Sequence, residues 1–85
     1  MYYLTRTGEL PYEQFCHSYD DAKFTLVQLA TIGVEDRASA DEFSDAEVRD
    51  AREMITNVAT STAPAEHGVR HFEIPYFGSW TIKRL

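Results

Sequence analysis

The sequence contains a single cysteine, Cys16, among its 85 residues. One cysteine excludes an intramolecular disulfide, so the chain does not belong with the small secreted domains that such bonds stabilise. The sequence also has no run near the roughly twenty apolar residues of a membrane span, and its first residues lack the basic start and apolar stretch of a signal peptide. We therefore expect a soluble protein of the reducing cytoplasm.

Catalytic, nucleotide-binding and metal-binding motifs are missing as well. Cys16, His17, His67 and His71 are four candidate zinc ligands. However, adjacent residues of a strand project to opposite sides, which makes one tetrahedral centre hard to build from these four. Cys16 is also a poor candidate nucleophile, because two acidic residues shortly after it raise the pKa of a thiol. The sequence predicts no metal, no cofactor and no enzymatic activity.

What the sequence does contain is enough apolar bulk for one core. Hydrophobic residues make up 44% of the chain, and the aromatic residues comprise five Tyr, five Phe and one Trp. A chain of this length forms one small domain, and most of its large apolar side chains must share a single core. We therefore predict one globular domain over residues 1–85.

The N-terminal segment predicts a β-hairpin. Residues 2–5 are strand-forming and are followed by the turn-prone Thr7 and Gly8. Residues 12–16 fit either a second strand or the start of a helix with Pro11 in its first position. We prefer the hairpin, because Ser18 begins a capping-box pattern and a helix should start just after it.

Two helices are predicted in the middle of the chain. The first covers residues 19–33, and its apolar face is so broad that we expect the helix to be largely buried. Residues 34–43 mix acidic and small residues and predict a linker, which ends with Phe43 as a hydrophobic staple. A second capping-box pattern at Ser44 predicts a helix that continues to about Thr60.

The C-terminal segment predicts the clearest hairpin of the chain. Residues 69–74 fit a strand in which Arg70, Phe72 and Ile74 share one face. Residues 75–79 form a turn, and residues 80–83 return with Trp80 and Ile82 on one side. The resulting order β-β-α-α-β-β predicts an α+β fold, in which two helices pack on one face of a four-stranded antiparallel sheet. An exposed edge strand of that sheet would permit a homodimer.

Charge is distributed unevenly along the chain, whose net charge is −6. Eight of the fourteen acidic residues lie between Glu35 and Glu53, where three arginines leave a net charge of −5. An acidic protein repels nucleic acid and favours protein partners, although acidity also serves solubility alone. The predicted partner-binding residues are these acids and two aromatic residues of the C-terminal turn: Glu35, Asp36, Asp41, Glu42, Asp45, Glu47, Asp50, Glu53, Tyr76 and Phe77.

These features favour a non-enzymatic, acidic protein-binding module. A fixed row of carboxylates competes with nucleic acid for a groove of Lys and Arg, so the segment is suited to mimic nucleic acid and to occlude a partner's surface. In its general character, small, acidic and without a cofactor motif, the chain resembles the inhibitory proteins of phages and mobile elements, including the anti-CRISPR type.

The alternative function is that of a nucleic-acid-associated regulator. Its basis is the C-terminal hairpin, which combines cationic side chains for phosphate contacts with aromatic side chains for base stacking. The residues concerned are Arg70, His71, Tyr76, Phe77, Trp80, Lys83 and Arg84.

Overall fold

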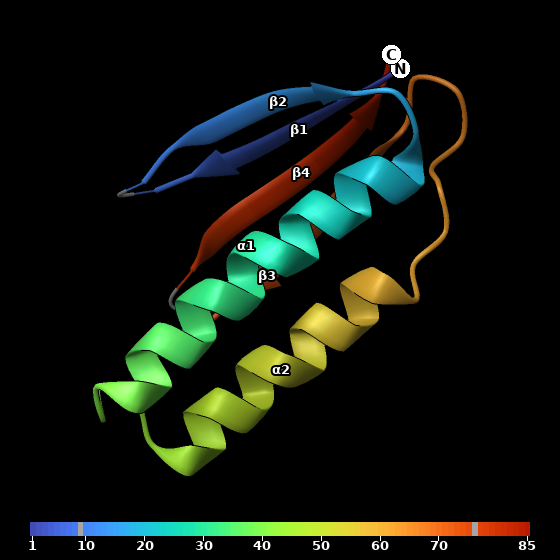
Figure 1. The fold of residues 1–85 in the computed structure, drawn as a ribbon. Coiled ribbons are helices and arrows are strands. Elements are labelled where there is room, and N and C mark those ends of the chain that lie inside the picture. The colour runs from blue at the N-terminus through green and yellow to red at the C-terminus, as the bar shows by residue number, and fades with distance from the viewer. Residues whose placement is uncertain (9, 76) are drawn as a thin grey trace.

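The protein is an antiparallel sheet with two helices on one of its faces (Figure 1). The computed structural model describes residues 1–8, 10–75 and 77–85. The elements are β1 (Tyr2–Thr7), β2 (Tyr12–Cys16), α1 (Tyr19–Ser39), α2 (Asp45–Ala59), β3 (Val69–Ile74) and β4 (Gly78–Arg84). The predicted α+β fold and its element order are confirmed, and residues 12–16 form a strand.

The first and last strands pair with each other at the centre of the sheet. The strand order is β2-β1-β4-β3, and in the β1–β4 pair Leu4 lies opposite Ile82. The two ends of the chain therefore meet, and the Leu85 amide donates a hydrogen bond of 3.0 Å to the Met1 carbonyl (Figure 1). The edges of the sheet are β2 and β3, where the predicted homodimer contact would have to form.

The core lies between the sheet and the helices. Leu4, Trp80 and Ile82 of the two central strands are fully buried. The helices supply buried rows of small and branched side chains: Ala22, Leu26, Ala30 and Val34 from α1, and Ala51, Ile55 and Val58 from α2. Residues four apart lie on neighbouring turns of a helix, so each row forms one continuous ridge against the sheet. No helix of the described residues is long and apolar enough to cross a membrane.

Helix α1 does not end at Gly33, as the sequence had predicted, but continues to Ser39. The buried row on α1 is completed by Val34, which holds the next turn against the core. Gly33 serves close packing instead of termination, because a Cβ atom there would lie 2.5 Å from Cε1 of Phe77. The predicted linker over residues 34–43 is therefore helical up to residue 39.

The prediction that α1 is largely buried is also wrong on one side of the helix. Phe24 is 68% exposed and Ile32 is 54% exposed. Both residues lie on the opposite side of α1 from the buried row, where neither the sheet nor α2 covers them. A helix in a two-layer fold buries only one face. When apolar residues surround the whole helix, those on the opposite face therefore remain exposed to water.

The predicted capping box at the start of α2 is confirmed. The Glu47 amide donates to Ser44 Oγ at 3.2 Å, and the Ser44 amide donates to Oε1 of Glu47 at 3.1 Å. Ser18 caps α1 in a similar way, with its Oγ accepting a hydrogen bond of 3.0 Å from the Asp21 amide. Both helix starts therefore follow from local sequence.

We expect Ser44→Ala to lower the free energy of unfolding by about 1 kcal/mol, because it removes the acceptor of the Glu47 amide. Urea denaturation followed by circular dichroism measures the loss. Ser39→Ala, at the exposed last residue of α1, is the matched control and should leave the urea midpoint nearly unchanged. Equal midpoints for both variants would contradict a stabilising cap.

Candidate functional site

The eight predicted acidic residues lie along the last turns of α1, the connection and the first turns of α2. We call this region the acidic end, and it comprises Glu35, Asp36, Asp41, Glu42, Asp45, Glu47, Asp50 and Glu53. It lies where the two helices join, at the lower end of the helix pair in Figure 1. Seven of the eight residues are exposed, and Glu47 is half-buried. The structure thus brings the sequence-predicted acids together in one region.

Two of the eight carboxylates form contacts within the protein. Glu47 closes the capping box of α2. Glu35 accepts hydrogen bonds from Arg52, at 2.7 Å from Nη2 and 3.2 Å from Nε, and this ion pair links α1 to α2. In the part of the chain that the structure describes, the other six acids form no salt bridge and face water.

Arg37 is packed against aromatic rings at the acidic end. Its guanidinium carbon lies 4.9 Å from the ring centre of Phe77 and 5.6 Å from that of Phe43. The two rings meet edge to face, with their centres 5.9 Å apart. Two of the three arginines that interrupt the acidic segment, Arg37 and Arg52, are therefore held by contacts within the protein.

Phe77, predicted at an exposed turn, is half-buried. Its ring packs against Gly33 and Arg37 of α1, so the β3–β4 turn is fixed to the acidic end. The structure thereby joins the two predicted patches, with Phe77 as a packing residue. Tyr76, the other predicted aromatic contact, lies outside the described residues.

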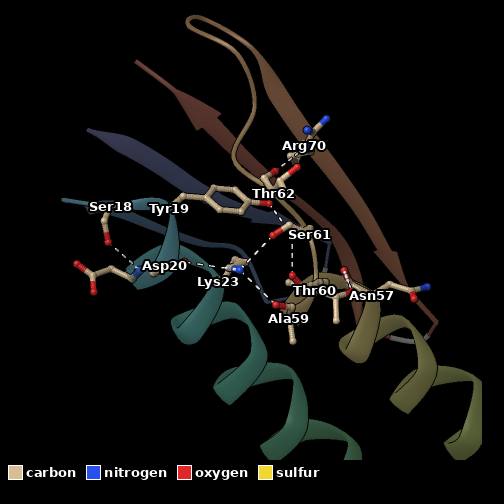
Figure 2. Close-up of polar contacts among 12 residues, drawn as sticks. Ser18, Tyr19, Asp20, Lys23, Asn57, Ala59, Thr60, Ser61, Thr62 and Arg70 are labelled. Carbon is tan, nitrogen blue, oxygen red and sulfur yellow. Dashed lines mark hydrogen bonds and ion pairs between the residues drawn. The ribbon is translucent and has the colours of Figure 1, made fainter.

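The opposite end of the helix pair is held by Lys23 (Figure 2). Its Nζ donates to the carbonyl oxygen of Ala59, the last residue of α2, at 3.2 Å and to that of Ser61 just beyond the helix at 3.1 Å. The Tyr19 hydroxyl lies 2.7 Å from Ser61 Oγ. Because α1 and α2 are joined by polar contacts at both ends, the acids that they carry are preorganised.

The C-terminal hairpin offers fewer groups for nucleic acid than its sequence suggests. Trp80 is fully buried and has no face for a base to stack on. Arg70 Nε donates to the Thr62 carbonyl at 2.9 Å, and Arg84 Nη1 donates to the Pro64 carbonyl at 3.2 Å. These arginines hold the loop between α2 and β3, which weakens the case for the alternative function.

Cys16 lies in a setting that suits a structural thiol. It is buried, and this burial, followed by the negative charge of Asp21, raises the pKa of the thiol above its ordinary value. A raised pKa keeps the thiol protonated at neutral pH, in which form it is a poor nucleophile. Across residues 1–8, 10–75 and 77–85, no three His, Cys, Asp or Glu side chains are grouped to hold a metal ion.

A pocket lies between the turns of the two hairpins, next to α1. Its lining residues are Arg6, Thr7, Gly8, Leu10, Arg37, Phe77 and Gly78. Both arginines take part in internal contacts: Arg6 lies 5.0 Å from the Trp80 ring centre and donates from Nε to the Leu10 carbonyl at 2.6 Å, and Arg37 contacts Phe77. We assign no ligand to this pocket.

The chain matches no protein-family model, and neither a curated protein nor a solved structure shows significant similarity to it. The functional argument therefore depends on the residues and the geometry described above.

Proposed function

We propose that this protein is a non-enzymatic protein-binding module, which occludes a basic surface of its partner with its acidic end. One observation carries the proposal: among the described residues, six exposed carboxylates without a salt bridge lie on a helix pair and its connection, and the two helices are tied at both ends. Preorganised charges lose little conformational freedom on binding and increase the rate of encounter with an oppositely charged surface.

The partner that fits this surface is a protein with a groove of Lys and Arg residues, such as a groove that binds nucleic acid. The carboxylates would compete there with phosphates, and binding would weaken with salt. The narrower form of the proposal is a cytoplasmic inhibitor of the phage or mobile-element type, directed against host defence. Its support is the small size, the acidic charge and the lack of a cofactor motif in the sequence.

We expect Asp50→Lys combined with Glu53→Lys to lose a partner that the wild type recovers from a nuclease-treated lysate at low salt. Reversing two charges replaces attraction by repulsion, and with the purified partner the association rate should fall about tenfold or more. Pull-down with mass spectrometry identifies the partner, and surface plasmon resonance at low and high salt measures the rate. Glu47 is left unchanged, because its reversal would also break the capping box.

The matched control is Glu66→Lys with Glu73→Lys, two exposed acids outside the acidic end with the same change in net charge. This control should retain the partner. If both variants bind equally well, the acidic end is not the contact. Recovery that requires intact nucleic acid would instead favour the hairpin alternative, and a band-shift assay with Lys83→Glu and Arg84→Glu would then test it.

A further inference from the structure

The outward side of α1 carries an apolar patch with acids at both ends. A shallow hollow there is lined by Phe24, Val27, Gln28, Thr31 and Ile32, and we call these residues the α1 outer face. Asp20 and Asp21 precede it along the helix, and Glu35 and Asp36 follow it. All four acids are exposed, although Lys23 Nζ lies 3.6 Å from Asp20 and Glu35 is paired with Arg52 of α2.

The α1 outer face has the character of an interface and not of an ordinary surface. Phe24 and Ile32 lie four residues before and four residues after Gln28, so the two large side chains stand about 12 Å apart along the helix with an amide between them. Large apolar side chains that gather on one exposed helix face, with a polar rim, are typical of a binding site for a partner helix.

A second copy of this chain could cover the apolar residues of the α1 outer face, but its acidic residues would then lie next to acidic residues. In an antiparallel pair centred on Gln28, Phe24 of one copy would meet Ile32 of the other. The same arrangement places Asp20 and Asp21 of each copy near Glu35 and Asp36 of the other, so acids face acids at both ends. A parallel pair brings each acid to its own equivalent. Like charges in these positions disfavour self-association in either direction.

We propose that the α1 outer face binds an amphipathic helix of a protein partner, whose apolar side chains are flanked at both ends by Lys or Arg. Such a helix covers Phe24 and Ile32 and places a cation near the acids at each end. This inference rests on the proposed function, because it gives the binding module a second contact surface and specifies the partner's chemistry. The two surfaces share Glu35 and Asp36 of α1, but the acidic end continues into α2, whereas the apolar residues of this surface all lie on α1.

The probe for this inference is a synthetic helical peptide with leucines at the spacing of Phe24, Gln28 and Ile32 and lysines at both ends. A second peptide is identical except for glutamates at its ends. We expect the lysine-ended peptide to shift the amide resonances of α1 and to bind at least about tenfold more tightly than the glutamate-ended peptide. Fluorescence anisotropy at low salt measures both affinities.

Two double variants locate the contact. Phe24→Ser with Ile32→Ser should abolish binding of the lysine-ended peptide. Leu10→Ser with Phe15→Ser removes two comparably exposed apolar side chains from elsewhere on the surface and should leave that binding unchanged. Equal loss in both double variants would mean that general surface hydrophobicity causes the binding, and would overturn the proposal.

A charge exchange makes the test independent of stability. In Asp20→Lys with Asp36→Lys the preference should reverse, so that the glutamate-ended peptide binds more tightly than the lysine-ended one. Equal affinity of the wild type for both peptides overturns the proposal. A dimer seen by analytical ultracentrifugation and abolished by Phe24→Ser with Ile32→Ser also overturns it, since the occupant would then be a second copy.

The two proposals can fail separately. If the peptide does not bind but Asp50→Lys with Glu53→Lys still loses the partner, the acidic end is the contact and this inference is wrong. If that acidic-end variant keeps the partner while Phe24→Ser with Ile32→Ser loses it, the contact lies on α1 and the placement at the acidic end is wrong.

Discussion

Trp80→Ala should destabilise the protein by about 3–5 kcal/mol, a large part of the free energy of unfolding of a domain this size. Trp80 is fully buried on the central strand β4, between Arg6 of β1 and Phe72 of β3. The Arg6 guanidinium lies 5.0 Å from its ring centre, and the Tyr12 ring centre lies 6.4 Å away. Alanine would leave a large cavity between three strands and α1.

Urea denaturation followed by far-ultraviolet circular dichroism measures this loss, since the tryptophan fluorescence disappears with the residue. Trp80→Phe is the control. Among the described residues the buried Nε1 of Trp80 has no hydrogen-bond acceptor, so phenylalanine removes an unsatisfied donor together with part of the ring. We expect a clearly smaller loss for Trp80→Phe. Equal losses would show that cavity volume does not set the cost at this position.

Gly78→Ala should lower the free energy of unfolding by at least about 2 kcal/mol. Gly78 begins β4 with a φ angle of +89°, which side-chain-bearing residues rarely adopt. A Cβ atom there would lie 2.5 Å from the backbone oxygen of Thr7. Thr7 pairs with Ser79 across the central strands, so the clash falls on the sheet ladder itself and not on a movable side chain.

Gly8→Ala separates the two causes of this loss. Gly8 also has a positive φ angle, +124°, but the nearest atom that a Cβ there would meet among the described residues outside its chain neighbours is Gly78 Cα at 4.0 Å. We expect Gly8→Ala to show the backbone strain without the clash and to be less destabilising than Gly78→Ala. Thermal and urea unfolding of both variants provide the comparison. If Gly8→Ala loses as much stability as Gly78→Ala, the contact with Thr7 is not the dominant cause.

The sequence was informative wherever the signal is local. A capping box acts over three residues, and Ser44 and Glu47 alone predicted the start of α2. Strand alternation acts over two residues, and it correctly placed Trp80 and Ile82 on the buried face. With two hairpins and two capped helices in order, few antiparallel arrangements remain, so the fold class followed from these local signals.

The errors came from contacts between distant parts of the chain. Glycine often ends a helix, but Gly33 lies under the ring of Phe77, which no local pattern reveals. The broad apolar face of α1 suggested full burial, yet the fold has only one layer on either side of the core and leaves Phe24 and Ile32 in water. The sequence predicted the buried row on α1. Which apolar residues of α1 stay exposed depends on where the sheet packs, and only the tertiary structure shows this.

The sequence by itself determined the helices, the strands and the uneven charge, because caps, alternation and composition depend on neighbouring residues. Only the tertiary structure decided which charges are available. It pairs Glu35 with Arg52 and stacks Arg37 on Phe43 and Phe77, contacts between elements that the sequence does not connect. The six remaining acids and the α1 outer face are exposed because a two-layer fold of this size has no further element to cover them.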